Sequence, residues 1–337
     1  KVSRHNLKKL AVDIPLHVLT SITGISGSGK SSLVQALVEL LTVRLGHESI
    51  NEEVDVDLES DAVAVTEGEI AGDVTITRVI QVDQKSIGRT PRSNLATYTG
   101  LFDHVRMLFA RTKLAKARRY DAGRFSFNVA KGRCGNCEGE GFVMVELLFL
   151  PSVYAPCPVC HGARFNEQTL EVTYKGRNIA EVLRLTVDEA AAFFADDAAV
   201  MKSLRILQDV GLGYLRLGQP ATELSGGEAQ RIKLATELQR QSRGDTLYIL
   251  DEPTTGLHPA DVERLMEQLH KLVAAGNTVI AVEHDMRVVS ESDWVIDLGP
   301  GAGDEGGRIV AQGRPADLAT SSKSVTAKYL ARFLAGA

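Results

Sequence analysis

The chain has 337 residues, so we expect about two domains and a sizeable buried core. Its hydrophobic content of 44% and charged content of 24% are typical of a soluble globular protein. The net charge of -5 excludes a basic field over the whole molecule, and no apolar run approaches the roughly 20 residues that cross a bilayer.

A phosphate-binding loop is predicted near the start of the chain. Val18–Thr23 is a β-branched and apolar run typical of a buried strand, and Ser32–Leu41 has a helical pattern. Between them GISGSGKS, Gly24–Ser31, fits GxxxxGK[ST], in which backbone N–H groups and a helix N-terminus bind phosphate oxygens. Lys30 is expected to reach the β- and γ-phosphates of ATP, and the Ser31 hydroxyl to bind Mg²⁺. The alternative is a glycine turn without a ligand. The predicted nucleotide-binding residues here are Gly24, Ser26, Gly27, Ser28, Gly29, Lys30, Ser31 and Ser32.

The segment that follows is acidic. Between Arg44 and Arg78 there is no Lys or Arg, whereas ten Asp and Glu residues lie from Glu48 to Asp73. We expect residues 46–73 to be a mobile acidic surface insertion, to which the sequence assigns no function.

A second charged segment has the opposite sign. From Arg106 to Arg133 there are nine Lys and Arg residues, and Asp121 is the one acidic residue among them. A solvated helix face is the simple explanation, but a local basic cluster can bind a phosphate backbone even in an acidic protein. Phe125 and Phe127 within the run either stack on bases or form the core of a small module. The candidates for nucleic-acid contact are Arg106, Arg111, Lys113, Lys116, Arg118, Arg119, Arg124, Lys131 and Arg133.

All four cysteines lie in one stretch, as two CxxC pairs. Between the pairs lies Glu138–Pro156, within the range of about 15–20 residues that such zinc sites have. Because four thiolates saturate a tetrahedral Zn²⁺, we expect a structural ion bound by Cys134, Cys137, Cys157 and Cys160. A redox pair or a disulfide is the alternative, but paired cysteines favour a metal site in a reducing cytoplasm. Gly141–Leu150, between the pairs, is expected to form a hairpin or a core strand.

LSGGEAQRIKLA, Leu224–Ala235, predicts the capped start of a helix. Ser225 is a good N-cap, and Glu228 stands at the spacing of a capping box. Gly226 and Gly227 also permit the close approach of another surface.

Two later segments predict buried strands that end on polar residues. Thr246–Glu252 reads TLYILDE, and the carboxyl end of such a strand lies where α/β sheets bind ligands. Asp251 suits Mg²⁺, and Glu252 can orient or deprotonate an attacking water. Asn277–His284 reads NTVIAVEH. Alone, His284 would be a surface or capped histidine, but after the LDE strand it is a candidate γ-phosphate contact.

The phosphate loop, LSGGE, ILDEPTTGL and VEH occur in an order that resembles ABC-type ATPases. The resemblance implies that Leu224, Ser225, Gly226, Gly227 and Glu228 close in trans on the ATP of a partner module. It also implies that Gln84 in VDQ is the Q-loop glutamine, which contacts Mg²⁺ and the attacking water. The predicted catalytic set is then Glu252, His284 and Gln84, and the predicted Mg²⁺ contacts are Ser31, Gln84 and Asp251.

Among ABC proteins the chain is similar to the UvrA family of bacterial nucleotide excision repair, in its C-terminal half. The landmarks are IGRTPRSNLATYTG, GRFSFNVAKGRC, VGLGYLRLGQPATELSGGEAQR and DWVIDLGPGAGDEGG. The first of these, the zinc-type insertion and the GLH turn separate UvrA from transporters. A group of UvrA-like paralogues resembles the chain most.

The resemblance implies an α/β fold, an ABC-type P-loop ATPase core with a large zinc-bearing α+β insertion between the Q-loop and the signature motif. We expect the core at 1–86 and 224–337, the insertion at 87–223 and the zinc module at 131–164. Because family members carry two ATPase modules in one chain, this chain is either a fragment or a half-size relative that dimerises.

The implied function is an ATPase that recognises damaged double-stranded DNA, with hydrolysis coupled to DNA engagement and no nuclease activity of its own. The implied partners are DNA, a second ABC module, and UvrB through a region that is absent here. The alternative is a UvrA-like drug- or damage-resistance binding protein, in which ATP only switches affinity. A transporter ATPase subunit is a third option and would need a membrane partner.

Overall fold

The computed structural model describes residues 1–46, 67–72, 75–147, 150–240 and 244–336, which form two compact units. The first unit comprises Lys1–Asp83 and Gln241–Ala337, and the second comprises Gln84–Arg240. The domain boundaries expected from the sequence stay a prediction, because a compact unit and a functional domain need not begin at the same residue. The expected acidic insertion falls mainly on residues outside the described ranges.

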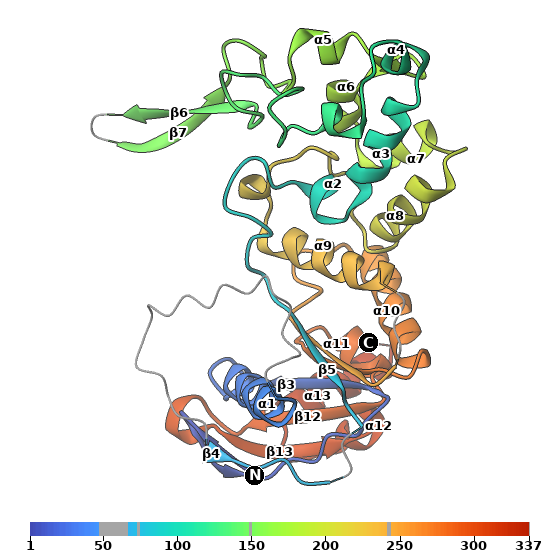
Figure 1. The fold of residues 1–337 in the computed structure, drawn as a ribbon. Helices are drawn as coiled ribbons and strands as arrows, with labels where there is room; N and C mark the ends of the chain where they lie inside the picture. The colour runs from blue at the N-terminus through green and yellow to red at the C-terminus, as the bar shows by residue number, and fades with distance from the viewer. Residues whose placement is uncertain (47–66, 73–74, 148–149, 241–243, 337) are drawn as a thin grey trace. The chain divides into compact units, whose positions relative to one another are not determined.

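The first unit is built on a six-stranded sheet with the order β13-β12-β3-β11-β10-β5 (Figure 1). Five strands are parallel, and β13 pairs antiparallel with β12 at one edge. A second sheet, β2-β1-β4, is antiparallel. The strands are β1 (Val2–Arg4), β2 (Leu7–Leu10), β3 (Leu19–Gly24), β4 (Glu67–Gly68), β5 (Arg78–Val82), β10 (Thr246–Asp251), β11 (Thr278–Val282), β12 (Trp294–Gly299) and β13 (Arg308–Gly313).

Helices cover both faces of this sheet, and every residue of its central strands β3 and β11 is buried. On one face Leu33 and Val34 of α1 pack with Ile22, Ile280 and other side chains of the strands. On the other, Val295 packs with side chains of α11, α12 and α13. The helices are α1 (Lys30–Arg44), α10 (Pro259–Ala274), α11 (Met286–Glu291), α12 (Pro315–Leu318) and α13 (Val325–Leu334). The α/β fold class and the three strands expected from the sequence are therefore confirmed.

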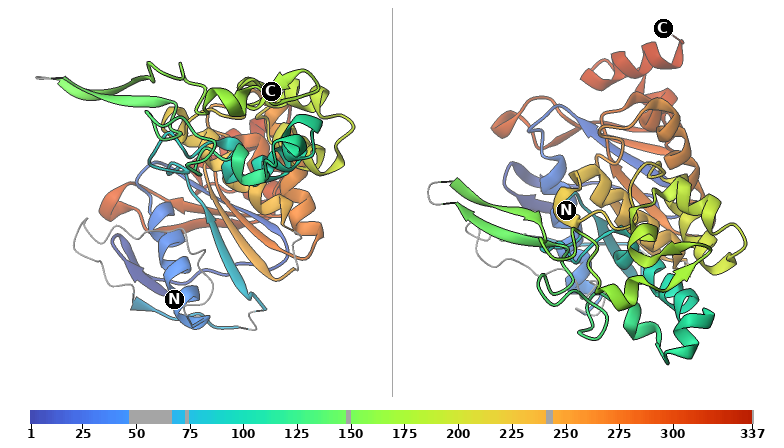
Figure 2. Two further views of the ribbon diagram at one scale, coloured as in Figure 1. Left: turned by 45° about the horizontal axis from the view of Figure 1, so that its top comes forward. Right: turned by 90° about the horizontal axis from the view of Figure 1, so that it is seen from above.

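The second unit is mainly helical and carries a β-hairpin (Figures 1 and 2). The hairpin pairs β6 (Phe142–Leu147) with β7 (Leu150–Pro156), so the hairpin alternative for this segment is confirmed. The short strands β8 (Thr173–Tyr174) and β9 (Arg177–Asn178) form a separate pair. The α-helices are α2 (Leu95–Tyr98), α3 (Leu101–Ala110), α4 (Lys113–Ala117), α5 (Glu167–Leu170), α6 (Ile179–Arg184), α7 (Val187–Phe193), α8 (Ala198–Asp209) and α9 (Gly226–Gln239).

Aromatic side chains form part of the core of the second unit. Phe127 stacks on Phe102 of α3 at 5.2 Å between ring centroids and meets Phe165 edge-on at 6.0 Å. Phe125 packs against Phe109 of the same helix, and both Phe125 and Phe127 are fully buried. The core interpretation of these two side chains is confirmed, since a ring held in the core cannot stack on a base.

No helix among the described residues has both the length and the apolar character that a membrane span requires.

Two glycines of the loop after β12 allow a test of its packing. Gly303 and Gly307 both have positive φ, at 57° and 71°. A Cβ on Gly307 would lie 2.1 Å from the backbone oxygen of Asn6, whereas one on Gly303 meets nothing within 4 Å. We expect Gly307→Ala to lower the free energy of unfolding of the first unit by about 3 kcal/mol or more, and Gly303→Ala by about 1 kcal/mol. Urea denaturation measures both, and equal losses would contradict the steric argument.

Candidate nucleotide site and four-cysteine centre

The predicted polar residues of the first unit meet at one edge of the sheet. The parallel register pairs Ile22 of β3 with Val282 of β11, and Val282 with Asp251 of β10. Because the carboxyl ends of parallel strands lie at the same edge, the phosphate loop, the acids after β10 and the residues after β11 emerge side by side.

The phosphate loop has the geometry of an anion site. Gly27 and Gly29 have positive φ, at 76° and 108°, and α1 begins directly afterwards at Lys30. The side chain of Lys30 is 8% exposed, and its Nζ donates to the backbone oxygens of Gly24 at 2.9 Å and Ile25 at 3.0 Å. The Ser28 hydroxyl is buried and has no hydrogen-bond partner in the described structure. A loop with a buried cation and a helix N-terminus can bind phosphate oxygens.

A neighbouring turn supports this loop. Asn6, between β1 and β2, donates from Nδ2 to the backbone oxygens of Gly27 at 3.3 Å and Gly303 at 3.2 Å. The loop after β12 adds backbone bonds, with Gly303 N donating to Gly27 O and Gly307 N to Ser28 O. Sequence reasoning missed Asn6, whose only signal was its place in a polar turn upstream of the phosphate loop.

The charges at the site alter one another's pKa. Burial lowers the pKa of Lys30, while Glu252, Asp297 and Asp251 act to raise it. Partial burial of its carboxyl and the nearby Glu252 raise the pKa of Asp251. Partial burial of the ring and the Lys30 cation lower the pKa of His284, whose Nε2 lies 3.6 Å from Oε1 of Glu252. One cation, three carboxylates and an imidazole are therefore electrostatically coupled.

The residues present fit a magnesium nucleotide. Ser31 offers an exposed hydroxyl at the start of α1, and Asp251 is exposed at the end of β10. Hydroxyl and carboxylate oxygens are the protein ligands that Mg²⁺ uses beside a nucleotide.

The signature segment belongs to the second unit. Ser225 caps α9 by accepting from the Glu228 backbone N–H, and the Glu228 carboxylate accepts from the Ser225 N–H. Tyr214 donates a third bond to Glu228 at 2.7 Å. Burial acts to raise the pKa of Glu228, but the bonds from Tyr214 and Ser225 hold it below its usual range. The predicted capping box is confirmed, and Tyr214 is a supporting residue that the sequence gave no reason to single out.

Gln84 also lies in the second unit, against the signature segment. A Cβ added to Gly226 would lie 3.1 Å from the Cβ of Gln84 and 3.2 Å from its Oε1. The next residue, Lys85, accepts at its backbone oxygen from Nζ of Lys233 in α9. The structure thus places Gln84 beside LSGGE, and the roles predicted for it toward Mg²⁺ and water stay predictions.

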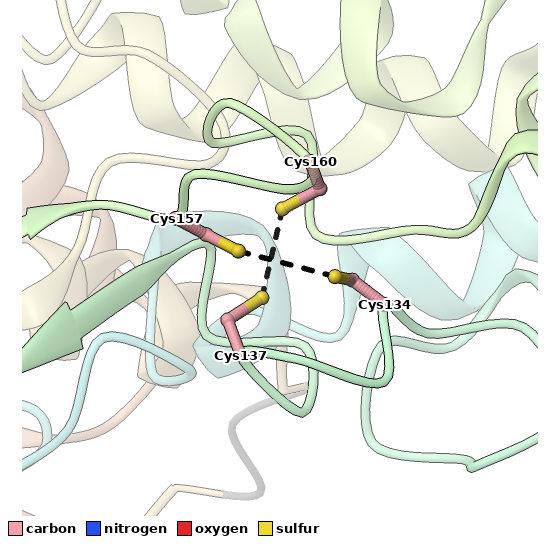
Figure 3. A group of neighbouring side chains, drawn as sticks. All are labelled: Cys134, Cys137, Cys157 and Cys160. Atoms are coloured by element: carbon pink, nitrogen blue, oxygen red, sulfur yellow. Dashed lines mark hydrogen bonds between the residues drawn. The ribbon is translucent and has the colours of Figure 1, made fainter.

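The four cysteines converge on one centre (Figure 3). Their Sγ atoms all lie within 4.8 Å of one another, with 4.0 Å between Cys134 and Cys157 and 3.6 Å between Cys137 and Cys160. Zn–S bonds of about 2.3 Å in a tetrahedron place sulfurs about 3.8 Å apart, so the donor set fits Zn²⁺. These separations are far longer than the roughly 2.05 Å of a disulfide bond. The clustering predicted from the two CxxC pairs is confirmed.

Arg164 ties this centre to the rest of the second unit. Its backbone oxygen accepts from the N–H of Cys134 at 2.9 Å. Its guanidinium, in a residue only 4% exposed, donates to the backbone oxygens of Pro91 at 2.8 Å and Gly218 at 3.2 Å and lies over the Phe127 ring. Burial lowers the pKa of Arg164 to about 10. Sequence reasoning missed this residue, because an arginine after a cysteine knuckle has no distinguishing pattern.

The basic residues proposed for nucleic-acid contact divide into two groups. Some are engaged within the unit: Arg124 binds Thr169 and lies 4.3 Å over the Tyr120 ring, while Arg118 pairs with Glu171. Arg106 pairs with Asp103, and Arg133 with Glu138. The other members of the set are exposed: Arg111, Lys113, Lys116, Arg119 and Lys131.

Comparison with known proteins agrees with these features. Residues 197–290 match a family described as "AAA domain, putative AbiEii toxin, Type IV TA system". The chain is 52% identical to UvrABC system protein A of Aquifex aeolicus over 334 residues and 53% identical to that of Mycobacterium bovis over 333 residues. These alignments cover 99% and 98% of this chain but 35% and 33% of the relatives, so the chain spans about a third of their length.

A solved structure gives the same result. The crystal structure of UvrA2 from Deinococcus radiodurans is 65% identical, with a TM-score of 0.86 over 98% of this chain and 38% of that chain. The expected resemblance and the expected fold are therefore confirmed.

Replacing one cysteine tests the metal centre. Cys137→Ala leaves three thiolates at a site that structural zinc fills with four, so we expect the loss of bound zinc and local unfolding of the cysteine module. Zinc content after denaturation and circular dichroism measure these changes. Nucleotide binding to the first unit, followed with a fluorescent ATP analogue, is expected to stay within about twofold of the unaltered protein. Full zinc retention would contradict the four-cysteine assignment.

Proposed function

We propose that this chain binds and hydrolyses ATP and that hydrolysis is coupled to the recognition of DNA damage, because the chain is a UvrA-family sequence over 98% of its length. The observation that carries the ATPase proposal is the meeting of Lys30, Asp251, Glu252 and His284 at one edge of a parallel sheet. Phosphate binding needs the cation, and hydrolysis needs a base beside it.

Each residue has a role in this proposal. Lys30 leaves the backbone oxygens of Gly24 and Ile25 and binds the β- and γ-phosphates, while the loop amides hold the remaining oxygens. Ser31 and Asp251 hold Mg²⁺, which when bound neutralises charge on the phosphates. Glu252 orients or deprotonates water, and His284 contacts the γ-phosphate. Gln84 contributes from the Q-loop.

The signature segment acts on a second ATP. Ser225, Gly226 and Gly227 begin a capped helix, whose N-terminal amides favour an anion. We therefore propose that LSGGE completes a nucleotide site of another ABC module, either in a longer chain or in a homodimer.

The second unit contacts DNA in this proposal. Its four-cysteine centre holds a structural zinc ion. The exposed basic residues of α4 and of the segment after it contact DNA phosphates and do not read the base sequence. Such contacts suit a sensor that must find lesions in any sequence, and the deformability of the duplex at the lesion then provides the signal. Partner proteins carry out incision, and UvrB receives the lesion. The cysteines are reduced, which suits the cytoplasm.

The 65% identity to a UvrA2 structure, against 52% and 53% to the two UvrA proteins, favours the paralogue group. A resistance protein that sequesters damaged DNA or an intercalating drug is therefore the second candidate. Steady-state ATP hydrolysis, measured with and without lesion-bearing duplex, distinguishes the two. Stimulation by the duplex supports the repair ATPase. A protein in which ATP only switches affinity does not need turnover for protection, so its hydrolysis need not respond to the lesion.

The catalytic assignment predicts a separation of binding from turnover. Glu252→Gln removes the base but not the phosphate contacts, so we expect kcat to fall by about 100-fold or more with ATP affinity within about threefold. The matched variant Asp251→Asn is expected to weaken magnesium-dependent ATP binding as well. Hydrolysis and equilibrium binding assays measure both effects, and a normal kcat in Glu252→Gln would overturn the assignment.

The exposed basic side chains predict the salt dependence of DNA binding. In Lys113→Ala/Lys116→Ala/Arg119→Ala we expect weaker binding and a log–log salt slope smaller by about 0.9 for each phosphate that the variant no longer binds. Fluorescence anisotropy with a lesion-bearing duplex over a salt series measures this slope. Lys202→Ala, an exposed change on α8 of the same unit, serves as the control. An unchanged slope in the triple variant would show that these residues do not touch phosphates.

A further inference from the structure

Glu283 is a buried carboxylate at the nucleotide edge of the sheet that none of the roles above uses. It follows β11 directly and is 2% exposed. Its Oε1 accepts from the backbone N–H of Thr254 at 2.9 Å and from the Thr254 hydroxyl at 2.8 Å. Its Oε2 accepts from the backbone N–H groups of His284 at 3.0 Å and Asp285 at 3.4 Å. Four donors thus converge on one side chain.

These donors come from two different loops. Thr254 lies in the loop after β10, two residues beyond Glu252, whereas His284 and Asp285 begin the loop after β11. Two further bonds hold Glu252 itself. Its Oε2 accepts from the hydroxyl of Thr255, and its backbone N–H donates to the backbone oxygen of Val282 at the end of β11. The chain joins Glu252 to Thr254, and His284 approaches Glu252 to 3.6 Å, so chain and contacts together form a closed ring through Glu252, Thr254, Glu283 and His284.

The ring holds groups that would otherwise be loosely fixed. The side chains of Glu252 and His284 are 43% and 46% exposed, and Glu252 has a positive φ of 46°. Side chains so exposed have little packing to hold them, and the left-handed backbone of Glu252 persists only where its surroundings impose it. Glu283, by contrast, is itself buried and held by four hydrogen bonds, so moving it would break all four and leave part-buried N–H and O–H donors without this acceptor.

We infer that Glu283 is a positioning residue, which fixes the loop of Glu252 and the loop of His284 relative to each other. This inference rests on the proposed ATPase function. The Glu283 carboxylate touches no reacting atom. It acts through the backbone of His284 and through the side chain and backbone of Thr254. Because a displacement of about 1 Å at a reacting group can cost about 100-fold in rate, such a residue affects kcat more than ATP affinity.

Glu283→Gln tests the inference in the intact protein. An amide of nearly equal size replaces one accepting oxygen by an NH₂ group, which faces donors and cannot accept from them. We expect kcat to fall by about 10- to 100-fold while the dissociation constant of ATP changes less than about threefold. Glu263→Gln, which removes an exposed carboxylate paired with Arg287 of α11, is the control and is expected to leave both values unchanged.

A double-mutant cycle separates positioning from general destabilisation. If Glu283 acts through His284, then Glu283→Gln in a His284→Ala background lowers kcat less than about twofold further. Equal fold-losses in both backgrounds would overturn the inference while leaving the role of His284 intact. An undiminished kcat in His284→Ala would instead overturn the proposed role of His284, and with it any action of Glu283 through that residue.

Thr254 supplies a milder variant in case Glu283→Gln does not fold. Thr254→Val keeps the shape of the side chain but removes one of the four donors, whereas Thr254→Ser keeps the hydroxyl. We expect kcat to fall by about threefold or more in the valine variant and to be restored in the serine variant, with ATP affinity unchanged in both. Equal kcat values in the two variants would count against the ring.

Discussion

The carboxyl edge of the six-stranded sheet is the constraint on which the nucleotide site depends. β3, β11 and β10 are adjacent and parallel, and their register brings Gly24, Asp251 and Glu283 to one edge from widely separated parts of the chain. A one-residue slip of β10 would reverse which side chains face each layer of helices, so packing of the apolar strand residues also fixes where Asp251 points. The hydrophobic core and the chemistry are thus determined together.

Buried charge is the second constraint, and each of the buried groups named here has its partners close by. Lys30 donates to two backbone oxygens, and three carboxylates act to raise its pKa, while Glu283 receives four hydrogen bonds. Asp297 of β12 accepts from the hydroxyl of Thr326 at the start of α13, and burial raises its pKa. Because an unsatisfied buried charge is costly, these partners hold the surrounding loops in place. The exposed Glu252 and His284 depend on that framework for their positions.

In the second unit the cysteine centre, an arginine and an aromatic cluster connect segments far apart in sequence. Arg164 joins the cysteine module to the backbone at Pro91 and Gly218, and Gly218 leads through η2 (Ala221–Glu223) to the signature helix. Phe127 packs between α3 and Phe165 beneath the same arginine. These contacts connect the cysteine module, within one unit, to the chain segment that precedes α9.

Features that depend on local spacing could be predicted from the sequence. The glycine loop before a helix, the two CxxC pairs and the Ser225–Glu228 capping box each have a pattern set by neighbours along the chain, and the structure forms all three. Contacts between distant elements became visible in the tertiary structure alone. Glu283, Asn6, Tyr214 and Arg164 have ordinary local surroundings, and partners distant in sequence hold Arg118 and Arg124 of the basic run. Hydrogen bonds and burial between remote segments leave no periodic signal in the sequence, because they exist only once the strands and helices have packed.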